Sequence, residues 1–388
     1  MNRFSVFISA GEPSGDTIAA LLARELKLGS SGIRLAGFGG PRMAAAGVRV
    51  DSSLMRGAIM GGTGAIRHLS LYLSLLRGLE RAWRVRPPNA VVLVDFPGFN
   101  FRVARIARRL GLPVYYYVCP QVWAWAPNRL ILMRRVLRRS FPVLPFEEPL
   151  HQAFGIRATF PGHPLLEILP SRPPDRVHAL GRAGFDPGRP LGALLPGSRR
   201  EEIERILPVQ LEAARRVTAR RPGLQWVVIA APGAEPHAAE HLNRAVAAGF
   251  PLSMVHDPDY SVRAHAAFAW TASGTSSLEL GLLGVPQAVV YRTSTINWAI
   301  GSRMLRIPWV GLVNLLLDRA AVPELLQDAL TPEALVRATE PFVRGDGARD
   351  AARRRASELR SMLKGSGASR TVAETILEDL RNAGTGGR

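Results

Sequence analysis

Short apolar runs alternate with stretches of helical periodicity along almost the whole chain, and this alternation restricts the folds that the chain can adopt. Runs of strand length cover residues 5–10, 33–37, 90–95, 114–118, 141–144, 192–195, 224–230, 268–271 and 286–291. Helical patterns include residues 17–28, 71–85, 101–110, 201–220 and 275–283. Because the connecting loops are short, the order strand–helix–strand predicts parallel sheets with helices on both faces.

A proline-rich segment at residues 170–190 interrupts this pattern once. The two halves of the chain, before and after this segment, begin with the same pattern of an apolar strand, a turn of small residues and a helix. The length of 388 residues suits two domains of roughly 150 residues each. We therefore predict an α/β protein with two Rossmann-like, doubly wound domains facing a cleft. The expected parts are a first domain at 1–169, a linker at 170–190, a second domain at 191–345 and C-terminal helices at 346–388.

The composition excludes several classes of protein. The single cysteine, Cys119, excludes a disulfide scaffold and a multi-cysteine zinc site, and it fits a reducing compartment. No run reaches the ~18 apolar residues that a membrane span needs, and the run at 5–10 is too short for a signal peptide. We expect a cytoplasmic protein whose membrane contact, if any, is at the surface.

The net charge of +19 comes almost entirely from arginine, since Lys27 and Lys364 are the lysines of the chain. Two explanations remain open. A genome of high GC content favours arginine codons over lysine codons. Alternatively, the chain has an anionic partner such as a nucleic acid, a phosphorylated substrate or an acidic lipid.

Two turns of the first half are candidate sites, because ligands of open α/β sheets bind beyond the carboxyl ends of the strands. The turn after residues 5–10 contains Glu12 and Asp16 around Ser14 and Gly15. These carboxylates can hold a sugar hydroxyl or act as a base; the structural alternative is that Ser14 or Asp16 caps the next helix. Asp95 ends an apolar strand, where partial burial would raise its pKa toward that of a general base, with helix capping as the alternative.

A turn in the second half suits a phosphate group. It contains Gly197, Ser198 and Arg199 at the start of a helix. Backbone N–H groups at a helix N-terminus and a guanidinium together make an anion site.

The turn after residues 268–271 follows the same logic and suits a diphosphate. It contains Ser273, Gly274, Thr275 and Ser276, with Glu279 one helical turn further on. A carboxylate facing a nucleotide commonly holds the ribose hydroxyls, whereas the alternative is a serine-rich N-cap. With Asp95 as a base, these turns describe an enzyme that acts on a nucleotide-diphosphate sugar.

Metal binding is not indicated. Residues 257–259 formally match an Asp-x-Asp metal motif, but this short pattern beside a proline is more typical of a turn. Arginine and helix dipoles would then neutralise the phosphate charge, so we expect neither a metal nor another cofactor.

Taken together, these segments resemble the lipid-A-disaccharide synthases, inverting glycosyltransferases of the GT-B type. The matching segments are 10–16 (AGEPSGD), 39–43 (GGPRM), 95–100 (DFPGFN), 120–125 (PQVWAW), 145–147 (PFE), 162–164 (GHP), 195–199 (LPGSR), 273–279 (SGTSSLE), 314–316 (NLL) and 324–327 (ELLQ). They occur in the order found in the family.

The resemblance implies a definite reaction. UDP-2,3-diacylglucosamine donates its sugar to 2,3-diacylglucosamine 1-phosphate (lipid X), and the products are the β-1,6-linked lipid A disaccharide 1-phosphate and UDP. Asp95 matches the base for the acceptor hydroxyl, and Arg199 matches an essential arginine near the leaving diphosphate. Residues 273–276, Glu279 and Asn314 match the UDP-binding region.

The resemblance also marks residues on the acceptor side. These are Glu12, Ser14, Gly15, Asp16, Trp123, Trp125 and His163. Family members often carry a glutamate after the Met-Gly of a first-domain loop, whereas residues 60–64 here contain none. Any such role would then be absent or pass to Glu12 or Asp16.

An apolar excess in the first domain fits a lipid substrate, although ordinary core packing can also explain it. The residues expected at the membrane or the acyl chains are Met55, Ile59, Met60, Leu69, Leu73 and Leu76. Arginine-rich helices in the same domain favour an anionic membrane surface, and without an aromatic stacking platform nucleic acid is not expected. We expect a cytoplasmic enzyme, peripheral on the inner face of the bacterial inner membrane, and possible homodimers.

Two other functions remain as alternatives. A UDP-N-acetylhexosamine 2-epimerase or a peptidoglycan-type N-acetylglucosaminyl transferase would use a similar fold but leaves the Trp-Ala-Trp segment unexplained. A two-domain binding protein without catalysis is the third possibility, and activity on any sugar nucleotide would exclude it.

Overall fold

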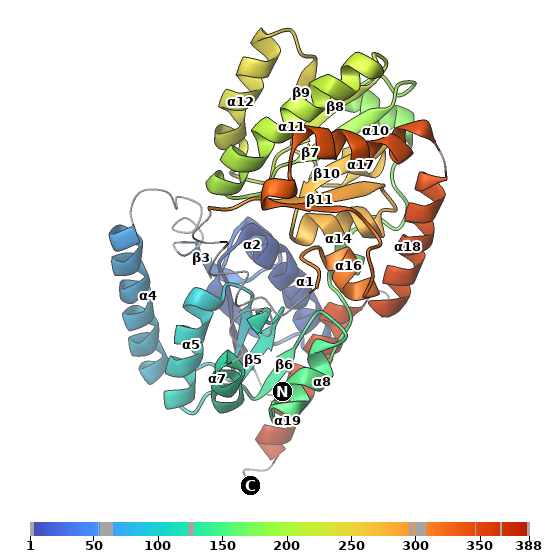
Figure 1. Cartoon of the computed structure of the whole chain (residues 1–388). Helices are drawn as coiled ribbons and strands as arrows, with labels where there is room; N and C mark the ends of the chain where they lie inside the picture. Colours follow the sequence, from blue (N-terminus) through green and yellow to red (C-terminus); the bar gives the residue numbers. More distant parts are fainter. Residues whose placement is uncertain are drawn as a thin grey trace. The chain divides into compact units, whose positions relative to one another are not determined.

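The computed structural model describes residues 4–52, 54, 65–122, 128–294, 298, 308–345, 347–364 and 367–385. The chain forms two compact units (Figure 1). Unit 1 consists of Met1–Glu167 and Leu363–Arg388, and unit 2 consists of Ile168–Met362. The proline-rich segment therefore belongs to unit 2, and the last helix of the chain belongs to unit 1.

The sheet of unit 1 has six parallel strands in its described part, in the order β3-β2-β1-β4-β5-β6. They are β1 Ser5–Ala10, β2 Arg34–Phe38, β3 Arg49–Asp51, β4 Ala90–Val94, β5 Val114–Tyr117 and β6 Arg139–Phe141. The order reverses between β1 and β4, and the register pairs Ala10 with Val94. The chain thus leaves the two central strands side by side, at Gly11 and Asp95, where the switch point of a doubly wound sheet binds ligands.

Helices of unit 1 lie between these strands and after the last of them. They are α1 Pro13–Gly29, α2 Pro41–Ala45, α4 Ala65–Val85, α5 Pro97–Arg109, α7 Asn128–Val136, α8 Glu147–Ala153, α9 Leu165–Ile168 and α19 Ala368–Thr385. Proline stands in the first turn of α1, α2 and α5, where its missing N–H is not needed.

Unit 2 repeats the topology of unit 1. The order of its strands is β12-β11-β10-β7-β8-β9, all parallel in the described part, and it reverses between β7 and β10. The strands are β7 Leu191–Leu195, β8 Gln225–Ile229, β9 Leu252–Val255, β10 Phe268–Ala272, β11 Gln287–Tyr291 and β12 Glu324–Leu326. The helices are α10 Arg176–Arg182, α11 Arg200–Arg220, α12 Glu235–Ala247, α13 Ser261–Ala264, α14 Thr275–Leu282, α16 Leu312–Leu317, the 3-10 helix η1 Gln327–Ala329, α17 Pro332–Arg344 and α18 Ala348–Met362.

Both faces of the unit 2 sheet are buried, as the apolar character of its strands predicts. Leu194, Trp226 and Trp270 belong to one core cluster. Their neighbours along the strands, such as Ala193 and Val227, belong to a second cluster. Because successive side chains of a strand point to opposite faces, the two clusters cover the two sides of the sheet.

The last helix, α19 (red in Figure 1), packs against α1 of unit 1. Glu167 accepts hydrogen bonds from the N–H groups of Gly367 (3.1 Å) and Ser369 (2.8 Å), and so fixes the start of this helix. Among the described residues, no helix combines the length and apolar character that crossing a lipid bilayer requires.

Candidate active site

Asp95 follows β4 in a strained backbone conformation. Its φ is +49° and that of Phe96 is +48°, in the left-handed region that costs a non-glycine residue roughly 1 kcal/mol or more. Two side chains hold the strained carbonyl. Asn100 Nδ2 donates to the Asp95 oxygen at 2.7 Å, and Tyr116 Oη donates to the same oxygen at 2.9 Å. The backbone of the half-buried Asp95 is therefore held in place at the end of β4.

Asn100 ties the start of α5 to both central strands. Its Oδ1 accepts from Ser9 Oγ at 2.7 Å, and its Nδ2 also lies within hydrogen-bond distance of the carbonyls of Ser9 (3.3 Å) and Val94 (3.2 Å). The residue is fully buried. Removing its amide would leave several buried polar groups without partners.

The turn after β1 contacts the Asp95 turn directly. A Cβ atom at Gly11 would lie 2.3 Å from the Phe96 ring, so only glycine allows this ring to lie there. Tyr72 of α4 packs against Phe96, with 6.2 Å between ring centres. Burial, and secondly the nearby Glu12 carboxylate, raise the pKa of Tyr72. Glu12 and Asp95 thus lie at the same edge of the sheet.

The Asp16 carboxylate accepts hydrogen bonds from backbone groups of the protein itself. Helix α1 begins at Pro13, so Ser14, Gly15 and Asp16 lie in its first turn. The buried Asp16 carboxylate accepts from the N–H groups of residues 40, 42 and 43 at 2.8, 3.0 and 3.1 Å, and so caps α2. Ser14 is exposed and Gly15 is buried. The carboxylate of this turn that does not cap a helix is Glu12, which is half-buried.

His163 is buried, and its Nδ1 accepts from the Leu165 N–H at 3.1 Å. Burial lowers its pKa to about 4, which keeps the ring neutral at pH 7. In this structure the side chain supports the backbone at residues 163–165. Trp123 and Trp125 lie outside the described residues.

The six side chains expected at the lipid differ in placement. Met55, Ile59, Met60 and the Leu69 side chain lie outside the described part. Leu73 is 42% exposed on α4. Leu76 instead packs in the core of unit 1, because it lies on the face of α4 that also carries the core residues Leu79 and Trp83, three and seven residues further on.

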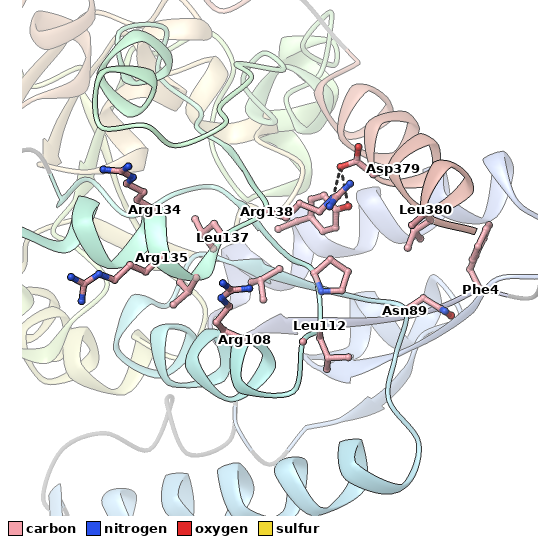
Figure 2. A pocket seen from close by; sticks show the side chains of 16 residues that line it. Phe4, Asn89, Arg108, Leu112, Arg134, Arg135, Leu137, Arg138, Asp379 and Leu380 are labelled. Atoms are coloured by element: carbon pink, nitrogen blue, oxygen red, sulfur yellow. Dashed lines mark hydrogen bonds and ion pairs between the residues drawn. The ribbon is translucent and has the colours of Figure 1, made fainter. Parts of the chain in front are cut away.

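A cavity of about 780 Å³ lies in unit 1 away from these residues (Figure 2). Its lining includes Phe4, Asn89, Leu112 and Leu137, which precede β1, β4, β5 and β6. The cavity is therefore at the amino edge of the sheet, opposite Asp95. Arg138 and Asp379 form an ion pair there at 3.2 Å.

In unit 2 the predicted phosphate turn begins α11. Gly197 has a φ of +118°, and Arg199 is the N-cap residue with a side chain that is 77% exposed. The N–H groups of Ser198 (3.1 Å) and Arg199 (3.3 Å) donate to Glu202 Oε2. Two of the donors that we expected to bind phosphate are thus directed at a carboxylate of the same helix.

The second predicted turn begins α14, with Gly274 at a φ of +145°. Ser273 Oγ donates to the Val310 carbonyl at 2.9 Å. Thr275 is exposed and Ser276 is half-buried. The register pairs Thr271 with Leu195, so this turn and the one at 197–199 leave adjacent strands at the same edge.

Asn314 supports this edge from within. It is fully buried, its Nδ2 donates to the Val322 carbonyl and to Glu324 Oε1, both at 2.8 Å, and its Oδ1 accepts from the Val322 N–H. Glu324 accepts in turn from the N–H groups of Val310 and Gly311, both at 3.0 Å. Asn314, which the resemblance assigns to the UDP-binding region, therefore supports residues 310–311 through Glu324.

Sequence reasoning missed two residues beside Glu279. Arg263 Nη1 donates to Glu279 Oε2 at 2.6 Å and its Nε donates to Asp257 Oδ2 at 2.9 Å. Tyr260 Oη donates to Glu279 Oε1 at 3.3 Å. Burial raises the pKa of Glu279, with Arg263 as the main opposing influence. The Asp-x-Asp pattern was the sequence signal that could have pointed to this cluster. Asp257 and Asp259 accept hydrogen bonds from groups at the start of α13, as in a turn.

Comparison with known proteins identifies the family. The chain matches the family model of Lipid-A-disaccharide synthetase over residues 6–376. It is 39% identical over 376 residues to a Lipid-A-disaccharide synthase of Myxococcus xanthus (strain DK1622), and 36% identical over 379 residues to one of Geobacter metallireducens. Each alignment covers 97% of both chains. The chain belongs to the lipid-A-disaccharide synthase family. It is accordingly a glycosyltransferase of lipid A biosynthesis, as the sequence motifs predict.

Solved structures confirm the fold class. A UDP-GlcNAc 2-epimerase from Neisseria meningitidis bound to UDP-GlcNAc has a TM-score of 0.66 at 11% identity, with 97% of this chain and 100% of that chain covered. The calicheamicin glycosyltransferase CalG4 has a TM-score of 0.58 at 17% identity, covering 97% and 99%. Both have the two Rossmann-like domains of the GT-B type. At such low sequence identities these structures support the fold alone, so they do not favour the epimerase as the function of this chain.

Proposed function

We propose that the protein transfers 2,3-diacylglucosamine from UDP to the 6-hydroxyl of 2,3-diacylglucosamine 1-phosphate, giving the β-1,6 disaccharide 1-phosphate and UDP. Family membership supports the reaction class. The observation that carries the assignment of roles is the rigid Asp95 turn at the switch point of unit 1, with the nucleotide-suited turns at the equivalent switch point of unit 2.

Asp95 acts as the general base in this proposal. Its carboxylate takes the proton of the acceptor hydroxyl while the hydroxyl oxygen attacks the anomeric carbon and the bond to UDP breaks. The hydrogen bonds from Asn100 and Tyr116 to the Asp95 carbonyl fix the backbone from which this side chain projects. Such positioning is how a general base within hydrogen-bond reach becomes effective.

Unit 2 holds the UDP part of the donor. The residues proposed for this role are Gly197, Ser198, Arg199, Ser273, Gly274, Thr275, Ser276 and Glu279. The N-termini of α11 and α14 and the exposed Arg199 guanidinium stabilise the negative charge that grows on the leaving diphosphate. Glu279 accepts hydrogen bonds from the ribose.

We further propose that unit 1 lies against the inner face of the inner membrane. Leu73 is exposed on α4, and the exposed arginines of the neighbouring α5 are Arg102, Arg105, Arg108 and Arg109. Each basic residue near an anionic surface contributes roughly 1 kcal/mol of attraction.

An assay with the two lipid substrates tests the reaction. The purified protein is incubated with UDP-2,3-diacylglucosamine and the 1-phosphate acceptor in the presence of EDTA, and disaccharide and UDP are quantified. We expect both products in equal amounts. Failure to form disaccharide, or conversion of lipid-free UDP-N-acetylglucosamine in its place, would contradict the proposal.

A further inference from the structure

A buried ionic cluster in unit 2 surrounds Glu279. The Arg263 guanidinium, 11% exposed, lies between the Asp257 carboxylate (0% exposed) and the Glu279 carboxylate (12% exposed). Because the guanidinium is planar and contacts each acid through a different nitrogen, it fixes where Glu279 lies relative to α13.

Asp257 holds the arginine in place. Its carboxylate accepts from the N–H groups of Val262 and Arg263, both at 3.0 Å, as well as from the Arg263 side chain. Arg263 Nη2 also donates to the Asp257 carbonyl at 3.3 Å. The orientation of the guanidinium is thus set by contacts that need no ligand.

Tyr260 completes the cluster. Its φ of +61° lies in the left-handed region, and the guanidinium carbon of Arg263 is 4.7 Å from the centre of its ring. Its hydroxyl donates to Glu279 Oε1. Among the described residues, each Glu279 oxygen therefore has one donor, while a carboxylate can accept about four hydrogen bonds in total. Acceptor capacity remains for a ligand.

A purely stabilising role explains this arrangement poorly. Buried ion pairs lose much of their attraction to desolvation, and replacing them with apolar residues is often neutral or stabilising. What such a cluster provides is a carboxylate held in one orientation.

We propose that Arg263 is a positioning residue that fixes Glu279 for recognition of the ribose hydroxyls of the UDP donor. The inference rests on the proposed function, in which unit 2 binds UDP. Arg263 acts through Glu279 and is not itself placed on the substrate. A site that hydrogen-bonds a hydroxyl discriminates against the analogue that lacks it, because its polar group is then left unpaired.

The test compares binding of UDP and 2′-deoxy-UDP by titration calorimetry. The full chain is used as wild type, Arg263→Met, Arg263→Lys, Glu279→Gln and the double variant Arg263→Met with Glu279→Gln. For the wild type we expect UDP to bind about 10- to 100-fold more tightly than the deoxy analogue, as for a hydrogen bond to a charged group. Arg319→Met is the matched control, because it removes an arginine–glutamate pair on the surface of the same unit.

Arg263→Met should bring the ratio of the affinities for UDP and 2′-deoxy-UDP close to one. The double variant should lose no more of this discrimination than Glu279→Gln alone. Arg263→Lys keeps the charge but cannot reach both carboxylates in the same way, so its ratio should lie between those of wild type and Arg263→Met. If Arg263→Met folds poorly, Arg263→Lys provides the test in its place. Arg319→Met should keep the wild-type ratio.

Two results overturn the inference and leave the proposed function standing. One is that either Arg263 variant keeps the wild-type ratio of the affinities for UDP and 2′-deoxy-UDP, while Glu279→Gln lowers this ratio. The other is additive losses in the double variant. A wild type that does not bind UDP would instead contradict the proposed function itself.

Discussion

Glu202 lies where the N-terminal amides of α11 converge, so the phosphate turn of unit 2 already contains a negative charge. Its second oxygen, Oε1, is 3.8 Å from Arg199 Nη1. In the proposed function, the leaving diphosphate would contact the exposed Arg199 guanidinium more readily than the two amides that Glu202 engages. We therefore propose that charge stabilisation at this turn depends mainly on Arg199.

Replacing Arg199 with alanine should lower kcat on the order of 10²-fold or more, the loss typical of a group that stabilises transition-state charge. The KM for the UDP donor should change much less. Steady-state kinetics with both lipid substrates measure the changes in kcat and in KM separately. The control is Arg200→Ala, the next arginine, which forms an exposed pair with Glu204 at 2.6 Å. A near-normal kcat in Arg199→Ala would remove this residue from the mechanism.

Contacts between distant residues limited what the sequence could predict of single side chains. The sequence correctly placed Asp95 at the end of a strand and Arg199 in the turn between a strand and a helix, because the apolar runs before them are clear. The hydrogen bonds of Asp16 and Asn314 could not be predicted, because their partners are groups that folding brings near. Arg263 was missed because its partner Glu279 is 16 residues away, beyond the reach of any local pattern.

At the scale of elements, strands with strong apolar runs were predicted to within a residue or two, except that the run at 141–144 overlaps β6, Arg139–Phe141, at one residue. β1 and β4 are examples, at Ser5–Ala10 and Ala90–Val94. The strands missed were β3, β9 and β12, which are short and lie at the edges of their sheets. β12, for instance, is partly exposed over its whole length, so its residues lack the apolar run that marks a buried strand.

Helix α19 could not be assigned to unit 1 from the sequence, because its attachment depends on long-range contacts. Tyr115 Oη donates to Asp379 Oδ2 at 3.0 Å, and Arg138 Nε donates to the same oxygen at 3.2 Å. These contacts join the end of the chain to β5 and to the loop before β6.

Asp379→Ala should lower the free energy of unfolding by about 2 kcal/mol, because it leaves the Tyr115 hydroxyl without its partner. It should leave kcat unchanged, since these contacts lie at the amino edge of the sheet (Figure 2). Thermal unfolding and the transferase assay measure the two effects. Glu378→Ala, an exposed neighbour on α19, is the control and should alter neither. Loss of activity without loss of stability in Asp379→Ala would contradict this account of α19.

At the scale of the whole molecule, two units share one strand topology and differ in what they bury. Unit 1 buries His151 and His163, and burial lowers the pKa of each to about 4. The unfolded chain takes up protons on these rings below about pH 6.5, whereas the folded unit does so only near pH 4. Stability is therefore complete above pH 6.5 and is lost as the pH falls toward 4.

We expect this effect to reach up to about 3 kcal/mol for each histidine. His163→Gln should therefore flatten the fall of the unfolding midpoint between pH 7 and pH 5. The exposed His178→Gln is the control and should keep the wild-type slope. Calorimetric midpoints across this pH range provide the measurement. An unchanged slope in His163→Gln would show that its burial does not set the acid sensitivity.

The division of labour between the units is tested most directly by Asp95→Asn, with turnover and UDP binding measured on the same preparation. The amide keeps the shape of the side chain but cannot take a proton, so turnover should fall on the order of 10²- to 10⁴-fold, the contribution of a general base. The affinity for UDP should stay at the wild-type value, because unit 2 holds the nucleotide. Retained turnover together with a loss of UDP affinity would contradict both assignments.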